Sequence, residues 1–459
     1  MEIPDHLTPA EKRATTGLAS IFALRMLGMF LILPVFALYA PSLSGGDDHF
    51  LVGMALGAYG LTQGLLQLPF GMLSDRIGRK KVIVIGLVIF ALGSFVAAVA
   101  DSIYWVIAGR VIQGAGAISA AVTAMLADLT REEHRTKAMA VIGMSIGATF
   151  ALSLVAGPML NDAVGVPGIF VLTGVLALLA IWVVKSYVPD PADTHFHADA
   201  EANPARLKDV LQDSQLLRLN YGIFALHAAQ MAMFVAMPVL LAKGAGLDPD
   251  HHQWVYLPVL LLSFVLMAPA IIVGEKRDKL KPVFVGAVAL MLAAQMSLMG
   301  VQHSLWGLAA ALLAYFVAFN VLEASLPSLI SKLAPASAKG TAMGVYNTAQ
   351  ALGLFAGGAL GGWLAEHYGF EALFAFCGAL MAGWLLLALG MKTPPAVRTR
   401  MYRVEGLDEA RAAELRSELA ALPGVREVAV MADEGMAVLK VAKSGWDEAA
   451  AMQLIKGEI

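Results

Sequence analysis

The stretch GMLSDRIGRKKV, from Gly71 to Val82, places one acidic and several basic side chains between two long apolar runs. These charges are conspicuous because 58% of the 459 residues are hydrophobic and only 15% are charged. The mean hydropathy of +0.71 lies above the range of soluble globular proteins. We therefore interpret the chain as a polytopic membrane protein, and this stretch as a loop between two of its transmembrane helices.

Apolar runs long enough to cross a bilayer recur along most of the chain. A helix needs about 20 residues to span the hydrocarbon core. On this criterion the sequence predicts twelve transmembrane helices, and the first of them, which lacks a small-residue cleavage motif, is expected to be retained. The predicted spans are residues 16–40, 50–73, 82–100, 103–127, 137–160, 165–188, 218–243, 253–273, 282–302, 304–330, 340–365 and 367–391.

The distribution of basic side chains among the predicted loops indicates how the protein is oriented in the membrane. The odd-numbered connections hold only Lys243. Lysine and arginine concentrate on the cytoplasmic side of membrane proteins, so both termini and the region after Met391 are expected to be cytoplasmic. The even-numbered connections hold many basic residues, among them Arg76, Arg79, Lys80, Lys81, Arg131, Arg135, Lys276, Arg277, Lys279, Lys281, Lys332 and Lys339.

A repeat relates the two parts of the apolar region. MFLILPV at Met29 matches MFVAMPV at Met233, and AMAV at Ala138 matches AMGV at Ala342, both with a shift of 204 positions. Each predicted half has six helices, so both halves start on the same side of the membrane and form parallel repeats. The predicted domains are an N-terminal half (1–188), a cytoplasmic linker (189–217), a C-terminal half (218–391) and a C-terminal domain (392–459).

The linker and the C-terminal domain are more polar than the rest of the chain. In the linker, Pro204 followed by leucine and valine on one face favours a helix lying on the cytoplasmic interface, and a flexible linker is the alternative. The C-terminal domain alternates as β-α-β-β-α, which predicts a small α+β ferredoxin-like module whose last strand is short or missing. It lacks a Cys-x-x-Cys motif, so no thiolate metal site is expected there.

The loop from Gly71 to Val82 resembles the signature of the major facilitator superfamily, Gly-x-Leu-x-Asp-Arg-x-Gly-Arg-Lys. The matching residues are Gly71, Asp75, Arg76, Gly78, Arg79 and Lys80. The resemblance implies an all-α membrane protein of twelve helices in two parallel six-helix repeats. It also implies that this loop is a conformational latch, which holds the halves together on the cytoplasmic side in the outward-open state, with the acid near residues 338–341.

Two further motifs resemble those of proton-coupled members and antiporters. In the predicted helix 103–127, Arg110, Gln113, Gly114 and Gly116 match the first motif. An arginine inside a membrane helix favours a role in proton or substrate coupling, and a structural ion pair or snorkelling is the alternative. Small residues that predict close helix packing in the second motif and its repeat are Gly143, Gly147, Gly157, Pro158, Gly357 and Gly361.

The predicted helix 304–330 contains a single acid, Glu323. A carboxyl group inside a helix bundle is a candidate for binding and releasing protons, and a neutral glutamic acid hydrogen-bonded within the packing is the alternative. Arg25 could meet an anionic group, and His227 is a weaker candidate for titration. Other polar side chains expected at a central cavity are Tyr59, Gln63, Gln67, Gln113, Asn320, Asn347 and Gln350.

Together with the C-terminal module, the segments FNVLEASLPSL and KGTAMGVYNTAQ resemble the YajR-type transporters of this superfamily. The resemblance implies a monomeric, proton-coupled exporter of small molecules in the bacterial inner membrane. The alternatives are a metabolite uniporter or proton symporter, and a transporter-derived sensor that signals through the C-terminal domain, which is a candidate for binding an unidentified ligand or partner. An enzyme, a cofactor, a metal site and nucleic-acid binding are not expected, because no matching motif occurs.

Overall fold

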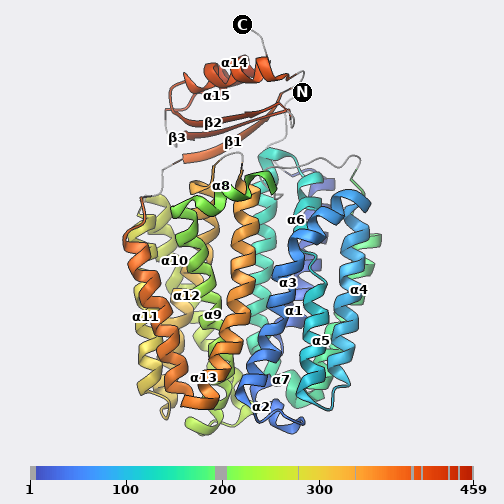
Figure 1. Ribbon diagram of the computed structural model, residues 1–459, viewed down its shortest axis with the longest axis vertical. Coiled ribbons are helices and arrows are strands. Elements are labelled where there is room, and N and C mark those ends of the chain that lie inside the picture. Colours follow the sequence, from blue (N-terminus) through green and yellow to red (C-terminus); the bar gives the residue numbers. More distant parts are fainter. Residues whose placement is uncertain are drawn as a thin grey trace.

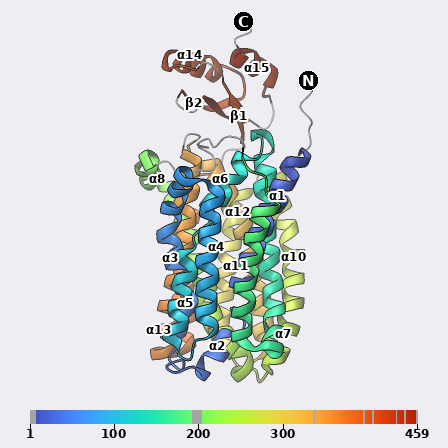
Figure 2. The same ribbon diagram turned by 90° about the vertical axis from the view of Figure 1, so that its right-hand side faces the viewer.

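The computed structural model describes residues 7–191, 204–277, 279–335, 338–393, 397–404, 407–432, 435–442 and 445–456. Long helices run side by side, and a small layer of strands and helices lies across one end of the bundle (Figures 1 and 2). The first helix also begins at that end, which we call the module end (Figure 2). The opposite end is called the far end.

The helices follow the predicted order. In the first half they are α1 (Pro9–Phe30), α2 (Phe36–Tyr39), α3 (His49–Ile77), α4 (Arg79–Ala98), α5 (Ile103–Ala115), α6 (Ser119–Asp128) and α7 (Glu132–Ser186). After the short α8 (Leu207–Gln212), the second half contains α9 (Ser214–Val239), α10 (Gln253–Lys276), α11 (Leu280–Gly300), α12 (Leu305–Leu333) and α13 (Lys339–Leu389).

Nine helical stretches of the described chain are long and apolar enough to cross a membrane. Those in α7 and α13 each join two helices at a glycine with non-helical backbone, Gly165 (φ 66°, ψ 172°) and Gly369 (φ 80°, ψ 175°). Glycine is favoured there because a side chain disfavours positive φ. Dividing both helices and adding the less apolar α1 gives the twelve predicted spans. The two glycines are 204 positions apart, which confirms the parallel repeat.

The first predicted span, 16–40, is wrong at both ends. Helix α1 begins at Pro9, because Thr8 and Glu11 form a capping box that satisfies the first backbone amides. It ends at Phe30, and a turn that contains Pro34 precedes α2. Proline lacks the amide hydrogen that a continuous helix needs.

The predicted span 103–127 is likewise not one helix, because residues 116–118 separate α5 from α6. At this break the backbones of two helices come close together. A Cβ atom on Gly116 would lie 2.2 Å from the carbonyl oxygen of Gly86 in α4. The break therefore depends on glycine at both positions.

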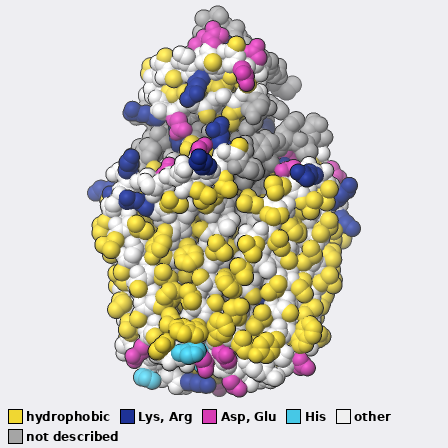
Figure 3. All heavy atoms as spheres, in the orientation of Figure 1, with side chains coloured by type: hydrophobic (Ala, Val, Ile, Leu, Met, Phe, Trp, Pro, Cys, Tyr) yellow, Lys and Arg dark blue, Asp and Glu magenta, His cyan; other side chains and the backbone are white. Residues whose placement is uncertain are grey.

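The outer surface of the bundle matches its expected environment. A broad apolar belt surrounds the helices, and charged side chains gather above and below it (Figure 3). Lysine and arginine are most frequent around the module-end rim (Figure 3). This distribution is typical of a protein that spans a bilayer.

The two halves meet most closely where α3 runs along α13. A Cβ atom on Gly53 would lie 1.9 Å from the carbonyl oxygen of Gly358, and one on Gly362 would lie 2.3 Å from that of His49. The backbone amide and Nδ1 of His49 also lie 2.9 and 2.8 Å from Oε2 of Glu366. Helices in contact through glycine backbones leave no room for a passage, so the far end is closed between these two helices.

The glycines predicted to pack closely in α7 and α13 divide into two groups. Gly157 approaches the carbonyl oxygen of Leu31, and Gly357 approaches that of Ala228, so that added Cβ atoms would lie 2.6 and 2.0 Å away. Gly361 also packs against α9, and Pro158 is buried nearby.

The prediction is wrong for Gly143 and Gly147 in this structure. Both lie on the module-end part of α7 with no atom within 4 Å of an added Cβ. Small residues there border open space rather than a partner helix.

The C-terminal domain has the predicted order of elements. Strands β1 (Val397–Arg403), β2 (Val425–Met431) and β3 (Met436–Ala442) form an antiparallel sheet in the order β1-β3-β2. Helices α14 (Glu409–Ala420) and α15 (Glu448–Lys456) contribute Leu415, Leu419 and Ala451 to a core with Leu439 and Val441. This arrangement leaves the other face of the sheet toward the bundle (Figure 1).

The face of the sheet toward the bundle is docked through Lys440 of β3. Its Nζ lies 2.5 Å from the carbonyl oxygen of Ala334 and 3.3 Å from that of Lys332, at the end of α12. The same Nζ pairs with Glu427 at 2.8 Å. A lysine amine stabilises the unpaired carbonyls at a helix C-terminus, so this residue joins the module to the second half.

We predict that Gly358→Ala opens the far end, because the new methyl group would overlap the backbone of Gly53. The distance between spin labels at exposed Asp47 and His367 should lengthen, and the open population should rise about tenfold, corresponding to roughly 1–3 kcal/mol of overpacking. Gly147→Ala, also in a helix but against open space, is the control. An unchanged distance distribution in Gly358→Ala would count against this contact as the seal.

We predict that Lys440→Met loosens the module without unfolding it, because methionine preserves the length of the side chain but not its hydrogen bonds. Amide hydrogen exchange around Lys332 to Ala334 should accelerate by about tenfold, since a hydrogen bond to a charged group contributes roughly 1.5–3 kcal/mol. Arg426→Gln, at an exposed position of β2, should have no such effect. Equal exchange in the two variants would contradict the docking role.

Candidate functional site

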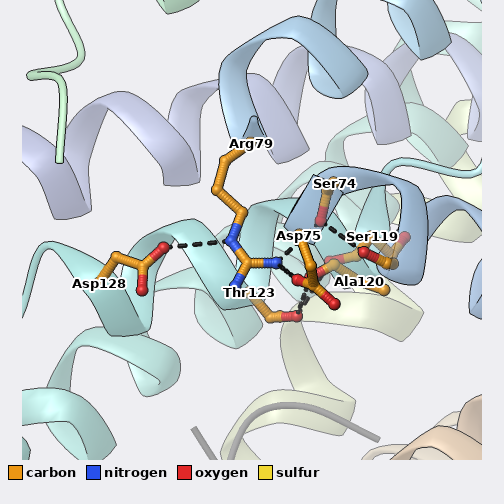
Figure 4. Close-up of polar contacts among 8 residues, drawn as sticks. Ser74, Asp75, Arg79, Ser119, Ala120, Thr123 and Asp128 are labelled. Carbon is orange, nitrogen blue, oxygen red and sulfur yellow. Dashed lines mark hydrogen bonds and ion pairs between the residues drawn. The ribbon is translucent and has the colours of Figure 1, made fainter. Parts of the chain in front are cut away.

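The signature loop between α3 and α4 is organised around the guanidinium of Arg79 (Figure 4). Its Nε donates to Asp128 at 3.1 Å, and its Nη1 donates to Ser74 at 2.9 Å and to Asp75. The side chains of Arg79 and Asp128 are buried, whereas that of Asp75 is 44% exposed. The motif thus links α3, α4 and α6 inside the first half.

The glycines of the motif shape the same loop. Gly78 ends α3 with a φ of 102°, a conformation that side chains rarely adopt. A Cβ atom on Gly71 would lie 3.2 Å from the Cβ of Ala120 in α6, so the helices approach closely there. Lys80 pairs with Asp190 at 2.8 Å, and Arg76 is exposed.

The resemblance implied that Asp75 contacts the start of the helix that follows residue 338. Among the described atoms, its carboxylate bonds to Arg79 instead. Residues 336 and 337 lie outside the described residues. The partner of Asp75 in this structure is therefore within its own half.

Arg110 lies inside the bundle and neither snorkels nor forms an ion pair with a described residue. Its Nε and Nη2 donate to the backbone carbonyls of Ala55 and Leu56 in α3, at 3.1 and 3.3 Å. Its Nη1 donates to Gln113 at 2.8 Å, which in turn bonds Ser94. The alternatives drawn from the sequence are wrong here, because backbone carbonyls hold the guanidinium in place.

Arg25 in α1 is also buried, on the other side of Tyr59. Its Nη2 donates to the hydroxyl of Tyr59 at 2.5 Å and to the carbonyl of Gly116 at 3.2 Å, and its Nη1 lies 3.4 Å from Ser119. The break between α5 and α6 supplies Gly116, and the first residue of α6 is Ser119. Gly114 allows this packing, because a Cβ there would lie 2.3 Å from the carbonyl of Tyr59.

A second polar cluster lies in the other half around Glu323 of α12. Its Oε2 is 3.9 Å from Nε2 of His227 in α9 and has no hydrogen-bond partner. Nδ1 of His227 faces the carbonyl of Ile223 at 3.2 Å, and Nε2 lies 2.7 Å from the amide nitrogen of Gln350 in α13. This arrangement assigns the proton to Nδ1, so Nε2 accepts a hydrogen bond from Gln350.

The remaining predicted polar residues are less closely connected. Asn320 donates to Ser263 of α10 at 3.0 Å, which joins α12 to α10. Gln67 is buried, whereas Gln63 and Asn347 are half-buried. The sequence reasoning missed Ser263 and Asp128. The repeat could have identified Ser263, which occupies the position equivalent to Tyr59 after the shift of 204.

A small cavity lies between the two halves. Its volume is about 10 Å³, close to the space for one water molecule. Tyr59, Arg110 and Met29 line it from the first half, and Gln230, Met231 and Leu354 line it from the second. Among the described side chains, no group of three or more His, Cys, Asp or Glu could hold a metal ion.

Comparisons with known proteins agree with this architecture. Residues 18–358 match the family model for the Major Facilitator Superfamily. The Inner membrane transport protein YajR of Escherichia coli (strain K12) is 44% identical over 435 residues, 95% of each chain. The Multidrug resistance protein MdtH of Proteus mirabilis (strain HI4320) is 28% identical over 358 residues, 74% of this chain and 84% of that relative.

Two solved structures share the fold at low sequence identity. The human organic anion transporter MFSD10 (TETRAN) has a TM-score of 0.61 and 20% identity, and the match covers 83% of this chain and all of that one. A bacterial homolog of the human lysosomal transporter Spinster has a TM-score of 0.66 and 13% identity, with coverage of 84% and 96%.

The family match includes parts of both halves of the bundle, and the similarity to YajR extends into the C-terminal module. These relatives are transporters and not enzymes. The chain belongs to the major facilitator superfamily and is a multi-pass membrane transporter, similar over nearly its whole length to an inner-membrane member.

Proposed function

We propose that this transporter is a proton-coupled exporter of small molecules that works by alternating access, as a monomer, in the bacterial inner membrane. The observation that carries the proposal is the carboxyl group of Glu323. One of its oxygens is enclosed without a hydrogen-bond partner, while 39% of the side chain is accessible. A carboxyl group that is enclosed and yet reachable by water is suited to bind and release a proton.

His227 and Gln350 support this role from neighbouring helices. Because Nε2 of His227 accepts a hydrogen bond from Gln350, it presents a polar neighbour 3.9 Å from the glutamate without a fixed positive charge. Protonation of Glu323 would allow it to donate toward this group. The hydrogen bonds that link α9, α12 and α13 would then differ between the protonated and the ionised form of Glu323.

The contacts between the halves support alternating access. The close contact of α3 with α13 and the pair of His49 with Glu366 close the far end. Hydrogen bonds that the backbone amide and the ring of His49 donate to Glu366 lower the pKa of this carboxyl group, so the glutamate stays ionised. The outward-open state would require these contacts to separate while the module end closes.

The distribution of basic side chains supports an orientation of the protein in the membrane. Basic side chains gather at the module end, and the positive-inside rule places such an end in the cytoplasm together with both termini (Figure 3). The direction out of the cell is supported by the relatives named multidrug resistance proteins. Under this proposal, Asp75 and Arg79 belong to the latch that stabilises the closed cytoplasmic end.

Glu323→Gln is expected to remove the proton-binding step, because an amide cannot titrate. Proteoliposomes on a solid-supported membrane should lose most of the charge displaced by a step in pH, by at least about tenfold, while the thermal unfolding of the protein changes little. Glu371→Gln, at an exposed acid near the far end, is the matched control. Equal charge displacement in Glu323→Gln and the unmodified protein would refute the coupling role.

Asp75→Asn is expected to shift the protein toward the state open at the module end, because it removes the carboxylate that the proposed latch would use when that end closes. The carboxylate is 44% exposed, so the effect should be about 1 kcal/mol, or roughly a fivefold change in population. Double electron–electron resonance between labels at exposed Lys81 and Lys279 measures it. Arg76→Gln removes a neighbouring exposed charge as the control, and a similar shift in both variants would argue against a specific latch.

A further inference from the structure

The buried polar groups of the first half carry an excess of positive charge. The guanidinium carbons of Arg25 and Arg110 lie 5.6 and 5.1 Å from the centre of the Tyr59 ring. Both arginines are at most 1% exposed. Their described hydrogen-bond partners are backbone carbonyls, two hydroxyl groups and an amide, all of them neutral.

Two other buried charged groups of the same half, those of Arg79 and Glu11, are paired with opposite charges. Arg79 bonds two carboxylates, and Glu11 bonds the guanidinium of Arg131 at 2.9 Å, which lowers the pKa of Glu11 to about 2 despite its desolvation. These pairs lie at the module-end rim. In the part of the chain that the structure describes, Arg25 and Arg110 have no such partner, although an unpaired buried charge is costly. Nε of Arg25 even lacks a hydrogen-bond acceptor.

Helix dipoles do not cancel this excess. The carbonyl of Gly116 that accepts from Arg25 lies at the C-terminal end of α5, where the dipole is equivalent to roughly half a negative charge. The start of α6 at Ser119 lies next to the same guanidinium and contributes the opposite partial charge. The two arginines therefore leave a net positive potential beside Tyr59.

The repeat places the opposite charge at the equivalent position of the other half. Ser119, which contacts Arg25, corresponds to Glu323 after the shift of 204 positions, and Tyr59 corresponds to Ser263. The first half is thus basic where the second half is acidic. The cavity between them is bordered by Arg110 and Tyr59 on the basic side and by apolar side chains such as Met29, Met231 and Leu354.

We propose that the central site, widened beyond its present small cavity, takes an amphiphilic organic anion, with its charge toward Arg110, which lines the cavity, and toward Arg25 next to Tyr59, and with its apolar body against the methionine and leucine side chains. The bound anion supplies the counter-charge that the first half lacks. This inference rests on the proposed transport function, but it concerns binding alone and does not require proton coupling. A cationic drug would meet two arginines without an acid on that side.

Tetraphenylborate and tetraphenylphosphonium provide a direct test, because the two ions have similar size and apolar surface and opposite charge. The midpoint of thermal unfolding of the full-length protein in non-ionic detergent is measured against the concentration of each ion, which gives an apparent affinity. The borate should bind at least about tenfold more tightly than the phosphonium. Equal affinities, a preference for the phosphonium, or no shift with either ion would overturn the proposal.

Two substitutions of Met29 distinguish the effect of a new charge from an effect on folding. Met29 lines the cavity and follows Arg25 by one helical turn, so Met29→Glu places a carboxylate beside the arginines. This variant should lose the preference for borate or reverse it, whereas Met29→Gln, a neutral side chain of similar size, should keep it. Identical preferences in Met29→Glu and Met29→Gln would show that the ions bind elsewhere and would contradict the assignment.

Substitution of Arg25 gives a second readout. Arg25→Lys keeps the charge and should retain the borate preference, whereas Arg25→Gln should reduce it by about tenfold. Loss in both variants would point to a packing role for the side chain and not to charge. Because these measurements need no proton gradient, Glu323→Gln should retain or strengthen the borate preference even if it abolishes coupling, since it removes a negative charge from the opposite half, so the two proposals can fail independently.

Discussion

The approach of α3 to α13 through glycine backbones is the contact on which the arrangement of the two halves depends. Gly53 and Gly358 leave no space for side chains, so the helices touch over their far-end turns and separate the outer side from the centre. The same contact holds the first half, which contains Tyr59 and Arg110, against the second half, which contains His227 and Gln350. A transporter that alternates must break this contact as a unit, because backbone surfaces in close packing do not slide past one another gradually.

The parallel repeat explains both the similarity and the difference between the halves. Gly165 and Gly369 turn the chain at equivalent places, so the halves share their helix order and packing. The polar interior has diverged on this common frame, with Arg25 and Tyr59 on one side and Glu323 and Asn320 on the other. Duplicated backbones can thus supply two chemically distinct surfaces to one central site.

The sequence predicted the features that depend on composition and spacing. Hydropathy predicted the number of helices, a constant shift predicted the repeat, and residue order predicted the elements of the C-terminal domain. Hydropathy did not reveal the breaks after Phe30 and at Gly116, because the residues around them are as apolar as the helices, although Pro34 and Gly116 are residue types that favour such breaks. Gly143 was misassigned because a small residue suits open space as well as close packing. Two partners of Arg110 are backbone carbonyls of α3, which the residue types of a motif do not record.

The equivalence of Ser119 and Glu323 has an electrical consequence. Parallel repeats are related by an axis along the membrane normal, so equivalent positions lie at similar depths. The separation between the basic and the acidic groups then runs within the plane of the membrane. A transmembrane voltage does work only on charge that moves along the normal, about 2.3 kcal/mol per elementary charge for each 100 mV. Rocking of the halves therefore carries little gating charge of its own, and the voltage acts mainly on the ions that are transported.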